Sequence, residues 1–229
     1  MDKKYNNLEK NTVSAQNQLE NSEFVRFSNQ QPNGIKILFV GNSITLHGVK
    51  EDIGWFNEHG MAASCIENDY VHKTIEMLSK TYPKIGFCIC QAAEWECNYK
   101  EGDSMLEPYK RAREFDADII IMRLGENCPK DNFDNVVFEE QYAKLVSFFN
   151  PKGNARVILT TGFWYHPFDE PVIDYAKKAN LPVVTLGDLG EQDEMKATGL
   201  FWHSGVAHHP SDLGMLSIAK RIVDCILEN

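Results

Sequence analysis

Continuous apolar runs alternate with amphipathic stretches from about residue 35 to the end of the chain. The first run, IKILFVG at 35–41, is rich in β-branched and aromatic residues, which is typical of a strand covered on both faces. Runs of the same kind follow at KIGFCICQ (84–91), DIIIMRLG (118–125), ARVILTTGF (155–163) and LPVVTLG (181–187). This pattern predicts five buried strands.

The stretches between these runs have the spacing of helices. We expect helices at residues 65–83, 106–115, 136–149 and 170–180, and a last helix that starts at Pro210, because proline is favoured in a first helical turn. The inner stripe of the last helix is predicted to hold Leu213, Leu216, Ala219, Val223 and Ile226. Strands that alternate with helices form a parallel sheet covered on both faces, and right-handed crossovers restrict it to a doubly wound sheet. The predicted fold class is therefore α/β, with three α/β/α layers around a five-stranded parallel sheet.

The chain is expected to form one domain. Residues 34–229 show neither an internal repeat nor a second hydrophobic core. Residues 1–33 are rich in Asn, Gln and Lys, which predicts a polar arm that is flexible or loosely docked. Within this arm, FVRF at 24–27 is the segment expected to attach it to the body.

Composition narrows the range of partners and compartments. A formal net charge of −10 argues against a nucleic-acid partner, because binding to phosphates depends on clustered Lys and Arg. The N-terminal stretch lacks the apolar core of a signal peptide, and no run approaches the roughly 20 residues of a membrane span. The six cysteines include no CxxC pair, so we interpret them as buried free thiols in a reducing compartment. We therefore expect a cytoplasmic protein without a membrane partner, and the sequence does not indicate its oligomeric state.

Polar and aromatic residues gather directly after the predicted strands. In open α/β sheets, ligands bind beyond the carboxyl ends of the strands. The residues in question are Asn42 and Ser43 after the first strand, GENC (125–128) after the third, FWYHP (163–167) after the fourth and GLFWHSGVAHHPSD (199–212) after the fifth. We expect the functional site at this edge of the sheet.

Ser43 and His209 are the candidate nucleophile and base. Ser43 falls where a strand gives way to a helix, so its backbone N–H could stabilise an oxyanion, although a lone serine there is more often a helix cap. Pro210 restricts His209 to an extended conformation at the entrance of the last helix, a suitable place for a general base. The Asn127 amide and the backbone N–H of Gly60 are further candidate donors, and both residues also suit ordinary turns.

Four short blocks occur in the order of the SGNH hydrolases, also called GDSL-type esterases and acylhydrolases: Gly41-Asn42-Ser43, Gly60, Gly125-x-Asn127 and His209-Pro210. The chain resembles this superfamily over roughly residues 35–229, and GNSITLHG…GW…GMAAS…DYVH is similar to a bacterial subgroup linked with carbohydrate esters. The resemblance implies a flavodoxin-like fold and an acyl-enzyme mechanism without cofactor or metal. It makes Ser43 the nucleophile and His209 the base, with the N–H groups of Ser43 and Gly60 and the Asn127 amide as the oxyanion hole.

The chain departs from the superfamily pattern at two positions. Asn42 stands where the superfamily usually has Asp, and no Asp lies three residues before the histidine: counting back gives Val206 from His209 and Gly205 from His208. A carboxylate in that place fixes the imidazole tautomer and stabilises the imidazolium. The candidates to replace it are Asp188, Glu126 and a backbone carbonyl near Trp202-His203-Ser204.

Aromatic residues in the predicted loops indicate the type of substrate. Flat exposed rings can stack on sugar faces, and the loops offer little Leu or Ile for a long acyl chain. The predicted substrate is therefore a short-chain ester, such as an acetyl ester, on a carbohydrate or another small polar molecule. The predicted substrate-binding residues are Trp55, Trp164, Trp202 and His203, with Phe56 and Tyr165 among the other loop aromatics.

Four other interpretations stay open at this point. A metal site could use His203, His208, His209 and a nearby carboxylate, although adjacent residues of an extended segment project in opposite directions. The missing acid could mark a catalytically impaired glycan-binding protein on the same fold. A lipid or thioester acylhydrolase is a third alternative. The fourth, a flavodoxin-like cofactor binder, is disfavoured because GNSITLHG lacks a Gly-rich phosphate loop.

Overall fold

A six-stranded sheet forms the centre of the computed structural model, which describes residues 23–28 and 32–228. The strand order is β1-β3-β2-β4-β5-β6. The strands are β1 (Val25–Ser28), β2 (Ile35–Gly41), β3 (Ile85–Gln91), β4 (Ile119–Arg123), β5 (Arg156–Thr160) and β6 (Val183–Val184). Strands β2 to β6 pair in parallel, and β1 pairs with β3 in the antiparallel sense.

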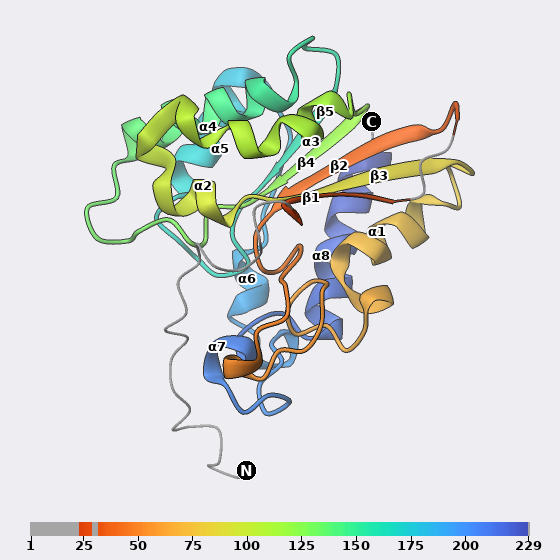
Figure 1. Cartoon of the computed structure of the whole chain (residues 1–229), viewed down its shortest axis with the longest axis vertical. Helices are drawn as coiled ribbons and strands as arrows, with labels where there is room; N and C mark the ends of the chain where they lie inside the picture. The colour runs from red at the N-terminus through yellow and green to blue at the C-terminus, as the bar shows by residue number, and fades with distance from the viewer. Residues whose placement is uncertain (1–22, 29–31, 229) are drawn as a thin grey trace.

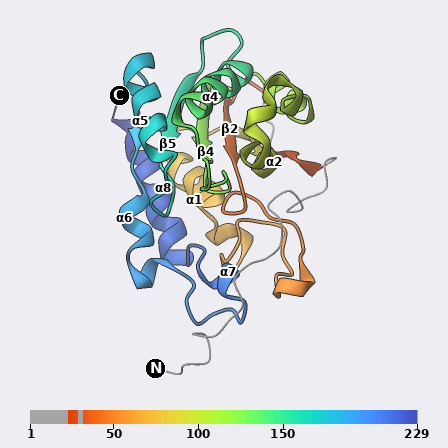
Figure 2. The same cartoon turned by 90° about the vertical axis from the view of Figure 1, so that its left-hand side faces the viewer.

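Helices cover both faces of this sheet, as Figures 1 and 2 show. α1 and α8 pack together on one face, and α2, α3, α4 and α5 cover the other. Their bounds are α1 (Tyr70–Leu78), α2 (Ala93–Asn98), α3 (Lys110–Glu114), α4 (Asn135–Phe149), α5 (Asp169–Ala179), α6 (Gly187–Gly190), α7 (Ser204–Ala207) and α8 (Asp212–Leu227). The predicted doubly wound α/β/α architecture is therefore confirmed.

The number of strands differs from the prediction. Residues Val25–Ser28, which were assigned to the polar arm, form the edge strand β1 along β3, and the adjoining Phe24 is buried. This strand covers an edge of β3 that would otherwise expose unpaired backbone groups. The folded body thus includes residues before 34, and the rest of the predicted arm, residues 1–22 and 29–31, lies outside the described residues. At the other edge, β6 contains two residues of the predicted 181–187 strand.

The start of the buried face of α8 is rotated relative to the prediction. Leu213 is 45% exposed and Leu216 is half-buried, whereas Met215, Ile218 and Ile222 are fully buried. Gly214 fixes this rotation, because a side chain there would collide with the backbone carbonyl of Met195. Ala219, Val223 and Ile226 are buried as predicted, so the prediction is wrong only at the start of the helix, where Met215 and Ile218 face inward in place of Leu213 and Leu216.

Two long connections at the carboxyl ends of the strands form the part of the molecule below the sheet in Figure 1. Residues 42–69 follow β2, and residues 185–211 follow β6. Aromatic contacts join them, since the rings of Trp55 and Phe201 have centroids 6.0 Å apart. A small second cluster holds the two connections together and consists of Ile53, Trp55, Met61, Ala62, Ala197 and Val206. This cluster is too small for a separate domain, but it is a second packed centre that the sequence pattern did not indicate.

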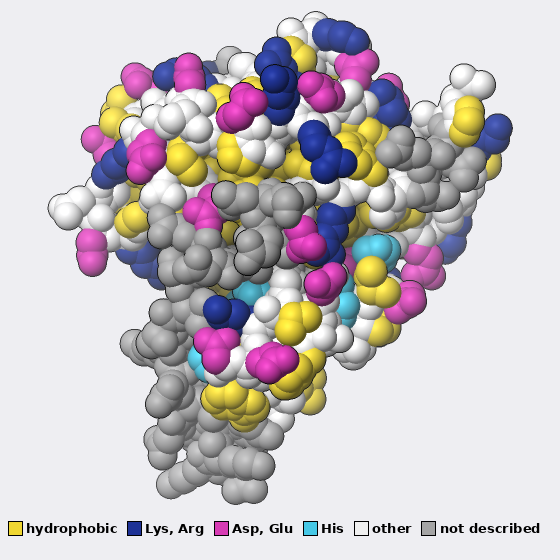
Figure 3. All heavy atoms as spheres, viewed as in Figure 1, with side chains coloured by type: hydrophobic (Ala, Val, Ile, Leu, Met, Phe, Trp, Pro, Cys, Tyr) yellow, Lys and Arg dark blue, Asp and Glu magenta, His cyan; other side chains and the backbone are white. Residues whose placement is uncertain are grey.

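The surface adds little about partners. In the part of the chain that the structure describes, no helix combines the length and apolar character needed to cross a bilayer. On the face drawn in Figure 3, the described Lys and Arg side chains are interspersed with Asp and Glu. The cytoplasmic location stays a prediction.

Candidate active site

Ser43 lies in a tight turn directly after β2. The backbone carbonyl of Asn42 accepts hydrogen bonds from the N–H groups of Thr45 and Leu46 at 2.8 and 2.9 Å, which closes a helix-like turn. Gly41 permits this geometry, because a Cβ there would collide with the Thr45 side chain and lie 2.8 Å from the Arg123 carbonyl oxygen. The turn brings the Ser43 hydroxyl to the carboxyl edge of the sheet, where the sequence predicted it.

The imidazole of His209 reaches Ser43 from the other end of the chain. The distance from Ser43 Oγ to His209 Nε2 is 2.8 Å, and the far ring nitrogen, Nδ1, lies 2.6 Å from the carbonyl oxygen of Gly205. A carbonyl only accepts hydrogen bonds, so Nδ1 carries the ring proton and Nε2 presents its lone pair to the Ser43 hydroxyl. This is the arrangement of a nucleophile and a general base. The predicted meeting of these two residues is present in the structure.

Burial keeps this imidazole neutral. Desolvation lowers the pKa of His209 to about 4, even though its hydrogen bond to Gly205 acts in the opposite direction. The ring of Trp164 packs edge-on against the imidazole, with centroids 5.6 Å apart, and helps to exclude water. At neutral pH the ring is therefore able to accept the proton of Ser43.

The group that orients His209 is a backbone carbonyl, which the sequence analysis left open beside two carboxylates. Gly205 belongs to the short helix α7, and the carbonyls in a last helical turn have no intrahelical partner. Asp188 instead pairs with Arg221 at the surface, with distances of 2.6 and 2.7 Å, and Glu126 pairs with Arg123. The structure therefore places neither candidate carboxylate on the far nitrogen of His209.

The candidate oxyanion donors are only partly brought together. Asn127 lines the same pocket as Ser43 and His209. Gly60 does not line it, because its N–H is directed to the Asp69 carboxylate at 3.4 Å, and the pocket residue from this loop is Met61. The predicted contribution of Gly60 to the oxyanion hole is therefore not supported by the geometry.

A buried polar network holds the strand ends beneath this pocket. Asn42 donates to Glu96 at 2.9 Å and to Glu126 at 2.6 Å, and its side-chain oxygen accepts from Arg123. Glu96 also accepts from the backbone N–H of Gly125 and from the Asn127 amide. An aspartate at position 42 would replace two N–H donors by a third negative charge, which explains why this chain has asparagine there.

The charges of the network are unequal. Burial and then the neighbouring Glu126 carboxylate raise the pKa of Glu96 to about 7, against the three hydrogen bonds that favour its charged form. Burial alone would raise the pKa of Glu126, but the Arg123 guanidinium at 2.7 Å holds it below its usual value. Glu126 is thus the charged partner of Arg123, whereas Glu96 titrates near neutral pH.

Glu96 is the site residue that the sequence analysis missed. It lies on α2, a six-residue helix whose N-cap residue makes no side-chain hydrogen bond, and its side chain is completely buried. Its sequence neighbourhood, AEWECN, contains two glutamates two positions apart, and only the structure shows which of them faces inward. The sequence shows no pattern that marks Glu96 as a buried carboxylate or that indicates its hydrogen-bond partners, so it could not be identified from the sequence.

The loop aromatics divide into buried and exposed residues. Trp55 is fully buried, with its indole N–H directed to the His47 carbonyl at 3.4 Å, and His203 is also buried, against Trp202. These two residues are therefore structural parts of the loops, contrary to the prediction that they bind substrate. Trp164 lines the pocket, and the large exposed aromatic side chains of the loops are Phe56, Tyr165 and Trp202.

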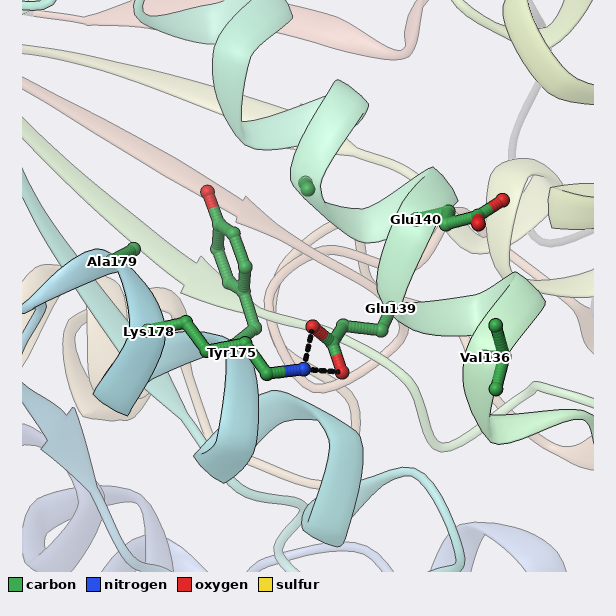
Figure 4. A pocket seen from close by; sticks show the side chains of 7 residues that line it. Val136, Glu139, Glu140, Tyr175, Lys178 and Ala179 are labelled. Carbon is green, nitrogen blue, oxygen red and sulfur yellow. Dashed lines mark hydrogen bonds and ion pairs between the residues drawn. The ribbon is translucent and has the colours of Figure 1, made fainter.

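The pocket around Ser43 is small, with a volume of about 90 Å³, and has room for only a few heavy atoms. It is lined by Asn42, Ser43, His47, Met61, Glu126, Asn127, Trp164 and His209. A larger groove of about 550 Å³ lies elsewhere, between α4 and α5, where Figure 4 shows the ion pair of Glu139 and Lys178. That groove contains none of the residues that sequence or geometry assigns to chemistry, so volume does not identify the site.

Metal ligation has no cluster to support it among the described residues. No three His, Cys, Asp or Glu side chains of residues 23–28 and 32–228 are grouped so that they could hold an ion. His203, His208 and His209, the proposed ligand set, do not form such a group, and His209 is engaged by Ser43 and Gly205.

Comparison with known proteins finds relatives by structure. No protein-family model matches the chain, and no curated protein matches its sequence. An active-site mutant of a family two carbohydrate esterase from Clostridium thermocellum matches with a TM-score of 0.60 and 15% identity, over 87% of this chain and 65% of that one. A two-domain esterase active on acetylated mannans matches with a TM-score of 0.52 and 17% identity, over 85% of this chain and 49% of that one. A Bacteroides uniformis protein described as a GDSL-like lipase matches with a TM-score of 0.56 and 14% identity, over 86% of this chain and 97% of that one.

These matches concern the fold. The chain spans between about half and two thirds of the length of the two carbohydrate esterases. The chain therefore has the fold of the SGNH hydrolases, the GDSL-type esterases that its short sequence blocks resemble.

Proposed function

We propose that the protein is a serine esterase that removes a short acyl group, such as acetyl, from a carbohydrate or another small polar alcohol. The observation that carries this proposal is the 2.8 Å contact between Ser43 Oγ and His209 Nε2 within a pocket at the strand ends. A serine hydroxyl needs such a base to become nucleophilic at neutral pH. The fold, shared with carbohydrate esterases, supports the same reaction class.

The reaction follows from the positions of the groups. Ser43 Oγ attacks the ester carbonyl carbon while His209 Nε2 takes the hydroxyl proton, and the carbonyl oxygen becomes an oxyanion. The backbone N–H of Ser43 and the amide of Asn127 are the proposed donors to that oxyanion. His209 then returns the proton to the departing alcohol oxygen, which leaves an acyl group on Ser43. A water molecule, deprotonated by His209, hydrolyses this acyl-enzyme and restores the free serine.

The size and surroundings of the pocket support the proposed substrate class. A cavity of about 90 Å³ fits a short acyl group and offers no long apolar channel. Exposed aromatic rings at Phe56, Tyr165 and Trp202 provide flat surfaces on the loops that follow β2, β5 and β6. The matched mannan esterase was co-crystallised with mannopentaose, and the active-site mutant of the family two carbohydrate esterase was crystallised with a cello-oligosaccharide. These ligands support a glycan ester as the substrate here.

A glycan-binding protein on the same fold is the second candidate. The observation that favours it is the neutral Gly205 carbonyl in the place where a triad has a carboxylate. A carbonyl fixes the tautomer of His209, but it stabilises the imidazolium less than a negative charge does.

Hydrolysis of a small aryl acetate distinguishes the two. We expect wild type to hydrolyse it, and Ser43→Ala and His209→Ala to lower kcat/KM by on the order of 10³-fold or more. Ser104→Ala is the matched control, since Ser104 is exposed and bonds only the Glu101 carbonyl. Equal rates for wild type and Ser43→Ala, together with retained oligosaccharide binding, would establish the binding protein instead.

A further inference from the structure

His47 is a polar residue of the pocket that the proposed reaction does not use. It lines the cavity together with Ser43 and His209, although its side chain is only 2% exposed. It comes four residues after the nucleophile, in GNSITLHG. His47 is therefore part of the wall that a molecule bound in this cavity would contact.

The position of this ring is fixed by three hydrogen bonds. The backbone N–H of His47 donates to the His59 carbonyl at 3.0 Å, and the Trp55 indole donates to the His47 carbonyl at 3.4 Å. Its ring nitrogen Nδ1 lies 2.6 Å from the carbonyl oxygen of Gly48. The ring is thus held in one orientation before any substrate arrives.

The same geometry determines which nitrogen carries the proton. The Gly48 carbonyl only accepts, so Nδ1 holds the hydrogen and Nε2 has a free lone pair. Nε2 makes no hydrogen bond with any of the described residues. Burial lowers the pKa of His47 to about 4, so the ring is neutral and Nε2 is an acceptor at neutral pH.

An ester group cannot satisfy this lone pair by itself. Both oxygens of an ester are acceptors, and an unsubstituted acyl chain has no donor. The partner of Nε2 must therefore be a donor on the alcohol half of the substrate, close enough to the ester to reach the same cavity. A hydroxyl on the carbon next to the esterified one meets both conditions.

We propose that His47 Nε2 accepts a hydrogen bond from a hydroxyl vicinal to the ester, and that His47 thereby selects monoesters of vicinal diols such as sugar rings. This inference rests on the proposed esterase function and adds the feature of the alcohol that the site recognises. An ester without that hydroxyl leaves Nε2 desolvated and unpaired, which costs binding free energy in the transition state as well as in the ground state.

Two esters that differ by one hydroxyl test the inference: trans-2-hydroxycyclohexyl acetate and cyclohexyl acetate. With rates normalised to alkaline hydrolysis, we expect wild type to favour the hydroxylated ester in kcat/KM by about tenfold or more. In His47→Asn the amide sits where Nδ1 was and nothing replaces Nε2, so this preference should fall to about one. In His47→Gln the amide extends to the position of Nε2, so the preference should stay above that of His47→Asn.

Each other outcome has a distinct meaning. If wild type shows no preference for the hydroxylated ester, the inference is wrong. If His47→Asn and His47→Gln both lose kcat/KM equally on the two esters, His47 is a structural residue and the inference is also wrong. If wild type hydrolyses neither ester faster than Ser43→Ala, the proposed esterase function has failed and the inference falls with it.

Discussion

Two halves of the candidate site are held in different ways. The strand-end half consists of Ser43, Asn127 and the residues beneath them. It is fixed by the hydrogen bonds that the Glu96 carboxylate accepts from Asn42 and Asn127, and by the ion pair of Glu126 with Arg123. The loop half carries His47 and His209, and backbone carbonyls and apolar packing fix it. The nucleophile therefore rests on a charged network, whereas the base rests on neutral groups.

This difference predicts different responses to change. In the strand-end half, removal of one member leaves a buried charge without a partner, which is costly. In the loop half, a substitution leaves no buried charge without a partner, so the loss of stability depends on how well the loops still pack. Burial is the main cause of the lowered pKa of His47 and of His209, and the backbone hydrogen bond of each ring opposes it only in part. Each of the following predictions tests one side of this contrast.

Arg123→Met should have the largest effect. Arg123 is fully buried and pairs with Glu126 at 2.7 Å, so its loss leaves two carboxylates in the interior without a cation. We expect the free energy of unfolding in urea to fall by about 3–5 kcal/mol. Arg221→Met is the control, because its pair with Asp188 at 2.6 Å is partly exposed and should contribute about 0–1 kcal/mol. Equal losses for the two variants would contradict the role given to burial.

Glu96→Gln should follow, with a loss of about 1–3 kcal/mol in the free energy of unfolding. Glu96 accepts from three N–H donors, and a glutamine has one acceptor oxygen and would turn an N–H toward another donor. Because Asn127 is one of those donors, kcat on an aryl acetate should also fall. Glu94→Gln on the same helix is the matched control, since Glu94 is only half-buried. A stable Glu96→Gln with unchanged kcat would show that the network does not position Asn127.

Gly54→Ala tests the packing of the loop half. Gly54 has φ 71° and lies under the Trp202 indole, with which a Cβ would collide. Gly153 has φ 67° and no atom within 4 Å of such a Cβ, so Gly153→Ala carries the same backbone strain without the collision. We expect Gly54→Ala to lose about 1–2 kcal/mol more than Gly153→Ala, with faster amide hydrogen exchange in residues 197–207. If the two variants lose the same amount, Trp202 does not hold the two loops together.

The pH dependence of activity involves the smallest expected change in free energy, but the direction of the change with pH is well defined. His209 works as a base in its neutral form, and burial lowers its pKa to about 4. Activity on an aryl acetate should therefore rise as the pH rises through about 4 and be high already at pH 5. The activity of wild type should change a second time near pH 7, because Glu96 has a pKa of about 7 in this network. This second change should be absent in Glu96→Gln. Half-maximal activity near pH 6.5 would mean that a partner other than the Gly205 carbonyl raises the pKa of His209.

The sequence was sufficient for those parts of the site that depend on regular structure. Continuous apolar strands bury themselves, and the turn after IKILFVG has to present Ser43 at the edge of the sheet. Pro210 and the apolar periodicity of the last helix placed His209 at the same edge. Residues 166 positions apart could thus be expected to meet, and they do so at 2.8 Å.

The remaining parts of the site depend on features that residue types do not encode. Any residue can supply a backbone carbonyl, so nothing in the sequence marks Gly205 as the acceptor for His209. Burial of Trp55 comes from a small cluster formed by two loops far apart in the chain, and an isolated loop tryptophan looks the same whether it is exposed or buried. The β1 strand was assigned to the arm because four residues are too few to show a clear period.

Labelling with a serine-directed fluorophosphonate tests the central claim most directly, because it requires both the nucleophile and the base but no knowledge of the substrate. Peptide mass spectrometry after incubation at pH 7 should find the label on Ser43 in wild type, much less of it in His209→Ala, and none at this position in Ser43→Ala. Labelling that leaves Ser43 unmodified in folded wild type, or that is equally fast in His209→Ala, would contradict the claim that these two side chains form a nucleophile and its base.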